Sequence, residues 1–203
     1  MSEQKERPII FNGEMVRAIL EGRKTQTRRI IKNVRQWCGD DCIGMPKAGN
    51  PLTDNFPIPL NSGFAEKICR YGKVGDLLWV KETWQPNPEA GMTYPEGKIS
   101  SDSVCYAADL SKYDYDESRP WKPSIHMPKW AARIWLEITD IRVERVQEIK
   151  EEDCNCEGCP WPADSDLKHR IWFETFWNSL NEKSGFGWKE NPWVWVIEFK
   201  RKK

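Results

Sequence analysis

Residues 22–29 read GRKTQTRR and open the one stretch in which the chain concentrates positive charge. The stretch continues to residue 35 and contains no acidic residue. Guanidinium groups hold oxyanions in a fixed fork, and a lysine amine can lose its proton when burial lowers its pKa. The stretch therefore suits a polyanion or a polarised carbonyl, although a solvated basic strand edge would have the same composition. Its cations are Arg23, Lys24, Arg28, Arg29, Lys32 and Arg35.

A strand and a helix are expected immediately before this basic stretch. Residues 8–11 form a short apolar run, and the side chain of Asn12 can accept a hydrogen bond as the N-cap of a helix with apolar residues at helical spacing. Gly22 should end that helix, because glycine readily adopts the left-handed backbone found just beyond helix C-termini. Residues 27–34 are expected to be extended. The basic stretch should thus run from a helix exit into a strand.

The rest of the chain alternates regular elements with irregular regions. A Gly-Asp turn in residues 74–84 precedes an apolar strand, and residues 134–146 interleave apolar with charged side chains, as a strand with one wet face does. The acidic residues 148–157 suit a short helix ended by Gly158, and residues 166–181 carry large apolar side chains at helical spacing. Further strands are expected at 104–107 and 191–199, and the basic tail 200–203 is expected to fray.

Length and composition favour one domain. With 203 residues the chain can build one sizeable core. Residues 33–72 and 85–120 are rich in turn formers and lack a sustained period, so we interpret them as two insertions in a single domain spanning residues 1–203. Basic and acidic residues number 31 each, so any affinity for nucleic acid must come from local segregation of charge. The 12 tryptophans can fill a core or stack bases.

The cysteines do not form a recognisable metal motif. The chain has seven, but Cys38-x3-Cys42 and Cys154-x-Cys156-x2-Cys159 lack the paired Cys-x2-Cys knuckles of structural zinc sites. We therefore expect reduced thiols, no metal and no cofactor. No apolar run approaches the roughly 18 residues of a membrane span, and the first residues lack the apolar core of a signal peptide. A cytoplasmic protein without a membrane partner is expected.

The octet also resembles a known signature. Gly22, Lys24, Thr27 and Arg29 fit the Gly-x-Lys-x-x-(Glu/Thr)-x-Arg signature of the ASCH superfamily, small PUA-like barrels associated with RNA. Residues 7–21 are similar to the longer, phage and prophage type of ASCH protein. The resemblance implies a mixed α/β, PUA-like β-barrel of about six strands with flanking helices. It also implies a pocket for a nucleobase, nucleoside or RNA as the partner, whereas protein partners are not indicated.

The resemblance further implies catalytic residues. In bacterial ASCH proteins that act as N4-acetylcytidine amidohydrolases, the working residues are a lysine and a threonine of the octet and a glutamate after the long strand. Lys24 and Thr27 occupy the first two positions, and Glu157 follows the strand at a comparable spacing, with Glu151 and Glu152 as alternatives. A hydroxyl beside a lysine of lowered pKa can supply a nucleophile and a base. Without the resemblance, Lys24 and Glu157 would be interpreted as a simple ion pair.

Two classes of function remain open. The first is hydrolytic, either an amidohydrolase acting on N4-acylated cytidine or a ribonuclease. The second is a non-catalytic module, of phage origin, that binds RNA or reads a modified base. The two tryptophans proposed for substrate binding can stack a base or fill the core, and the histidine can bind a ligand or serve the structure. The predicted substrate-binding residues are Arg23, Arg28, Arg29, Trp84, His126 and Trp130.

Overall fold

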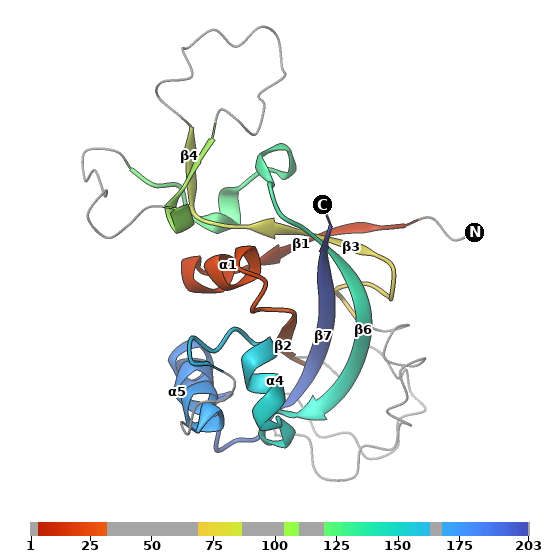
Figure 1. The fold of residues 1–203 in the computed structure, drawn as a ribbon, viewed down its shortest axis with the longest axis vertical. Coiled ribbons are helices and arrows are strands. Elements are labelled where there is room, and N and C mark those ends of the chain that lie inside the picture. Colours follow the sequence, from red (N-terminus) through yellow and green to blue (C-terminus); the bar gives the residue numbers. More distant parts are fainter. Residues whose placement is uncertain (1–3, 32–68, 87–103, 110–119, 163–167, 203) are drawn as a thin grey trace, which may run out of the picture.

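The computed structural model describes residues 4–31, 69–86, 104–109, 120–162 and 168–202. Most of the two predicted insertions, residues 33–72 and 85–120, lies outside these described residues, as do Lys32, Arg35 and the Cys38 and Cys42 pair. Among the described residues, no helix is both long enough and apolar enough to cross a membrane. The molecule is a mixed α/β protein with a curved sheet (Figure 1), and helices pack against both faces of that sheet.

The main sheet has five strands, in the order β1, β3, β6, β7, β2. The β1/β3 pair is parallel and the other pairs are antiparallel. Within the described residues no ladder joins the edge strands β1 and β2, so the sheet is open where a closed barrel of about six strands was predicted. A side chain bridges the edges, because Arg29 Nη2 donates to the carbonyl of Ile10 at 2.6 Å. The strands are β1 Glu6–Ile10, β2 Gln26–Ile30, β3 Leu77–Lys81, β6 Trp135–Arg145 and β7 Trp193–Lys202.

A second, two-stranded sheet stands apart from the main one. It pairs β4 (Trp84–Pro86) with β5 (Val104–Tyr106) in antiparallel fashion, which confirms the short strand expected near residue 104. In Figure 1 this sheet lies beyond α1, on the side opposite α4 and α5. Two short 3₁₀ helices, η4 (Ser124–His126) and η5 (Lys129–Ala131), connect it to β6.

Each predicted helix is present, although α4 and α5 begin at Glu151 and His169, three residues after the predicted starts at 148 and 166. Helix α1 spans Gly13–Leu20, and the Asn12 side chain accepts a hydrogen bond from the Met15 amide at 2.9 Å. Gly22 follows with φ of +78°, the left-handed conformation that ends a helix with little strain for glycine. Helix α4 spans Glu151–Cys156 and α5 spans His169–Asn181.

The expectation that the C-terminal tail frays is wrong. Strand β7 continues to Lys202, where it pairs with Trp135 at the start of β6. Strand β6 is 11 residues long, so it offers backbone partners well beyond the apolar part of β7. Backbone pairing does not depend on side-chain hydrophobicity, and a charged segment can therefore complete the ladder.

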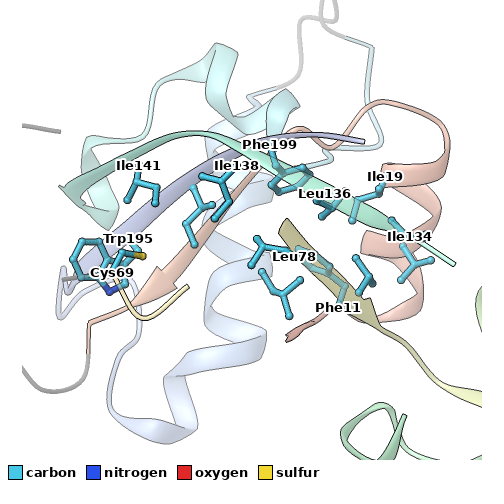
Figure 2. Packing of buried hydrophobic residues seen from close by; sticks show 14 of the residues in the cluster. Phe11, Ile19, Cys69, Leu78, Ile134, Leu136, Ile138, Ile141, Trp195 and Phe199 are labelled. Carbon is cyan, nitrogen blue, oxygen red and sulfur yellow. The ribbon is translucent and has the colours of Figure 1, made fainter. Parts of the chain in front are cut away.

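Strand β7 is buried on both faces, which explains its nearly continuous apolar run. On one face Trp195 and Phe199 join Leu78 and Leu136 in the main core, which α1 covers (Figure 2). On the other face Val194 and Val196 pack against α4 and α5. This second core holds α4 and α5 beside the turn that links α1 to β2.

Candidate active site

The turn between α1 and β2 carries the octet and is fixed from both sides. The Lys24 amide donates to the carbonyl of Ala18 at 3.0 Å, which turns the chain back along α1. The Thr25 amide donates to the carbonyl of Cys156 at 2.9 Å, which joins the turn to the last residue of α4. The turn and the end of α4 are thereby held in direct contact, although they are far apart in the sequence.

Gly158 makes this contact possible. Its φ is +97°, a backbone conformation that residues with a Cβ rarely adopt. A Cβ at this position would lie 3.0 Å from Ala18 Cβ and 3.3 Å from Lys24 Cβ, closer than carbon atoms normally pack. A glycine here lets α4 end against α1 and places Glu157, its C-cap residue, over Lys24.

Lys24 and Glu157 form a buried ion pair. The Lys24 ammonium donates to Glu157 Oε2 at 2.8 Å and to the backbone carbonyl of Glu157 at 2.7 Å. The exposed fractions of the two side chains are 0% and 3%. Burial lowers the pKa of Lys24 from its ordinary value, the charge of Glu157 partly offsets that effect, and the charges of Arg29 and Arg28 add to it. The amine is thus easier to deprotonate than an exposed lysine.

Arg28 adds a second buried cation to the pair. Its guanidinium is fully buried and donates to Glu157 Oε1 at 3.2 Å, to Glu144 Oε2 at 3.0 Å and to Asp153 Oδ2 at 3.1 Å. A guanidinium that serves three carboxylates of the protein has little capacity left for a ligand. Glu157 is therefore shared between two buried cations, Lys24 and Arg28, both of which belong to the octet.

Two adjoining pockets meet at Glu157. The inner pocket, of about 240 Å³, is lined by Thr27, Arg29 and an aromatic wall from α5 made of Phe173, Phe176 and Trp177. The outer pocket, of about 400 Å³, is lined by charged residues of α1 and the following turn, including Arg23. Met15, Phe176 and Glu157 belong to both pockets. We call the two pockets together the cleft. Lys24 lines neither pocket and reaches the cleft through Glu157.

The remaining cations of the octet differ in exposure. Arg23 lies at the surface, pairs with Glu21 and donates to the carbonyl of Gly158 at 3.0 Å. Arg29 stacks over the Phe11 ring at 5.0 Å while its guanidinium bonds the carbonyl of Ile10. Both side chains line the cleft, but each already has a partner within the protein.

The other predicted substrate-binding residues lie elsewhere. Trp84 is buried in a small core formed around β4 and β5, and its ring meets the exposed Trp130 edge to face at 5.9 Å. His126 is exposed on η4. The structure does not bring these three residues to the cleft. Of the alternative carboxylates, Glu151 and Glu152 are exposed on α4 and line neither pocket, whereas Glu157 is buried at the cleft.

Sequence reasoning missed several residues of the cleft and of the ion-pair network beside it. Glu144 on β6 and Asp153 on α4 hold Arg28, but nothing in their local sequence distinguishes them from other surface carboxylates. The predicted apolar stripe of α5 includes Phe176 and Trp177 but not Phe173, and the sequence assigns none of the three to substrate binding. The available signal was the run of aromatic side chains in residues 172–177.

No family model matches this sequence, and no curated protein matches it either. Among solved structures, the chain is similar to an ASCH domain from Lactobacillus crispatus, with 12% identity over 97% of this chain and 79% of that chain, at a TM-score of 0.41. It is also similar to a protein of the DUF984 family from Enterococcus faecalis, with 7% identity over 99% of this chain and 82% of that chain, at a TM-score of 0.43. These likenesses concern the overall fold and carry no conclusion about activity.

Proposed function

We propose that this chain is an ASCH-type, PUA-like protein whose cleft binds a nucleobase or nucleoside and hydrolyses the amide of N4-acylated cytidine. The observation that carries the proposal is the convergence of the three residues that the octet and α4 supply. Thr27 and Glu157 line the inner pocket together, and Lys24 is hydrogen-bonded directly behind Glu157. A nucleophile, a carboxylate and an amine of lowered pKa are the groups that amide hydrolysis requires.

The inner pocket suits a base in size and in lining. Its volume of about 240 Å³ is close to the lower end of typical ligand pockets, so it fits a single heterocycle rather than a large ligand. Phe173, Phe176 and Trp177 offer ring surfaces, and base–aromatic stacking contributes about 1–3 kcal/mol per base. Thr27 and Glu157 add polar groups to the same lining, and the exocyclic amide of the base would react beside them.

The reaction would proceed in two balanced steps. The Thr27 hydroxyl attacks the acyl carbonyl, its proton passes to the Glu157 carboxylate, and the Arg29 guanidinium faces the developing oxyanion. The C–N bond then breaks, and the proton is returned to the leaving N4 atom, which releases cytidine. A water molecule next attacks the acyl-threonine and loses its proton to Glu157. The ester C–O bond then breaks, and Glu157 returns that proton to the Thr27 oxygen as the carboxylic acid leaves. Lys24 exchanges protons with Glu157 across their hydrogen bond, which its lowered pKa favours.

One observation favours the second candidate, a non-catalytic module that reads a base or binds RNA. Lys24 lines neither pocket, and Glu157 is bound by two buried cations, Lys24 and Arg28. In this second candidate function, the network only joins α4 to the octet, and the aromatic wall binds a base without any reaction.

The experiment that separates these functions is release of acetate from N4-acetylcytidine. Thr27→Val removes the hydroxyl at constant shape and should lower the rate by about 10²-fold or more, while Thr27→Ser should restore much of it. Thr25→Ala is the matched control, because Thr25 is exposed and lines neither pocket, and it should leave the rate unchanged.

Lys24→Arg and Glu157→Gln test the proton path in the same assay. Arginine keeps the charge but cannot titrate, so we expect loss of acetate release with nucleoside binding within a few fold of wild type. Thermal melting and circular dichroism check that both variants fold. If the wild-type protein binds the nucleoside but releases no acetate, the hydrolase is rejected and the non-catalytic module that reads a base is supported. Cleavage of an RNA oligomer instead would indicate the ribonuclease.

A further inference from the structure

The outer face of the main sheet carries two neighbouring indoles. Leu78 and Leu136 point into the core (Figure 2), so the residues adjacent to them in their strands, Trp79 and Trp135, point to the opposite face. The two tryptophans are directly opposite one another in the antiparallel β3/β6 ladder. Residues in such positions have Cβ atoms about 5 Å apart on the same face. Both are half-buried, and Trp79 also packs against the small core that contains Trp84 and Met127, so only part of each side chain is accessible.

Lysines surround these two rings. The Lys81 ammonium lies 5.5 Å from the centre of the Trp79 ring, and the Lys129 ammonium lies 5.7 Å from the centre of the Trp135 ring. Lys202 is the register partner of Trp135 across the β6/β7 ladder, which places it on the same face. We call this group, together with Lys200 two residues before Lys202, the Trp–Lys face.

The charge of the Trp–Lys face is positive although that of the whole chain is zero. Two carboxylates oppose its four lysines, because Glu6 pairs with Lys129 and Glu137 pairs with Lys200 at 3.3 Å. For Lys81 and Lys202, the described part of the chain provides no acidic partner. Lys81 and Lys202 can therefore bind external anions without breaking an internal ion pair.

The cleft differs from this face in the state of its cations. There Arg28 is fully buried among carboxylates, and Arg23 is paired with Glu21. A chain of phosphates would find few available cations in the cleft. On the Trp–Lys face, Lys129 and Lys200 are paired with carboxylates, whereas Lys81, which donates to the carbonyl of Ile125, and Lys202 have no acidic partner among the described residues. A ligand with alternating anionic groups and flat heterocycles matches that arrangement, and single-stranded nucleic acid has both.

We propose that the Trp–Lys face binds single-stranded nucleic acid, with bases stacked on Trp79 and Trp135 and phosphates bound by Lys81, Lys129 and Lys202. Stacking of bases on aromatic side chains of an open sheet is a known mode of single-strand recognition. The face is separate from the cleft, since none of its residues lines either pocket. The proposal therefore does not depend on the hydrolytic activity.

The test is binding of a fluorescein-labelled oligouridine of about 12 nucleotides, a length within typical single-strand site sizes, followed by anisotropy over about 50–200 mM salt. Each lysine that contacts a phosphate contributes about 0.7 to the slope of log affinity against log salt. The triple variant Lys81→Ala, Lys129→Ala, Lys202→Ala should therefore reduce the slope by about 2. The matched triple Lys168→Ala, Lys183→Ala, Lys189→Ala removes three exposed lysines near α5 and should leave the slope unchanged.

The indoles are tested separately. Trp135→Ala should weaken binding by about 5- to 150-fold, whereas Trp135→Phe keeps a ring for stacking and should retain most of the affinity. Melting curves confirm that each variant is folded. Wild type that does not bind the oligomer at low salt, or a lysine triple with the wild-type slope, would overturn the proposal. Thr27→Val should still bind the oligomer, so loss of the deacylase and loss of this face are distinguishable.

Discussion

The Glu157 carboxylate should be the most costly single charge to remove from this protein. It is 3% exposed as a side chain and holds the ammonium of Lys24 at 2.8 Å and the guanidinium of Arg28 at 3.2 Å. Glu157→Gln keeps the shape but leaves two buried cations short of one carboxylate. Breaking a buried ion pair from one side costs about 3–5 kcal/mol. Because Arg28 keeps Glu144 and Asp153, we expect most of that loss to come from Lys24.

The loss of stability in Glu157→Gln should decrease as the pH rises. Glu157 raises the pKa of Lys24 against the larger lowering by burial, so Glu157→Gln should lower the pKa of Lys24 further. The unfolded chain binds the Lys24 proton up to its ordinary pKa, whereas the folded variant releases it earlier, so the stability of the variant rises with pH in that window. The difference in unfolding free energy between wild type and variant should therefore be largest near neutral pH and shrink toward about pH 10.

Urea denaturation at several pH values measures this difference. Glu152→Gln is the matched control, since Glu152 is an exposed carboxylate of the same helix, and it should change stability by no more than about 0.5 kcal/mol. The double variant Lys24→Met, Glu157→Gln should cost less than the sum of the single changes by more than about 1 kcal/mol. Equal costs for the two glutamine variants, or additive single changes, would refute the reasoning.

Two further predictions concern the same junction. Folding lowers the pKa of Lys24, so the unfolding free energy of the wild type, relative to that of Lys24→Met, should rise as the pH approaches the ordinary lysine pKa. A difference in unfolding free energy that stays constant with pH in urea titrations would contradict this. Gly158→Ala combines a positive φ with contacts of 3.0 and 3.3 Å, so thermal melting should show a loss of about 2–5 kcal/mol in stability. The control Gly185→Ala, at φ of +77° with no atom within 4 Å, should lose about 1–2 kcal/mol. Equal losses of stability would count against the contact with α1.

Local sequence determined much of the fold. The ends of α1 follow from an asparagine that can cap it and a glycine that can end it, and both interactions involve only neighbouring residues. The apolar run in residues 191–199 indicates a strand, and Gly158 indicates the end of α4. Hydrogen bonds and backbone conformations of this kind act over a few residues, so they can be predicted from a short window.

The open sheet could not be predicted in the same way. Closure of a barrel depends on whether two edge strands meet, and β1 and β2 are joined by the side chain of Arg29 rather than by a ladder. The extension of β7 to Lys202 likewise depends on the length of β6. Both features are set by a partner strand that is distant in the sequence.

The charge state of the octet was decided only by the tertiary structure. In the sequence, residues 22–29 form an open cationic cluster, but the protein buries Lys24 and Arg28 against carboxylates that come from β6 and α4. The partner of Lys24 lies 133 residues away in the sequence. Trp84, His126 and Trp130 have side chains that could bind a base, as the residues of the cleft do, yet they lie outside the cleft. Residue type determines which chemistry is available, whereas burial and the identity of the partner determine whether a charge is free, paired or titratable, and these depend on packing across the whole chain.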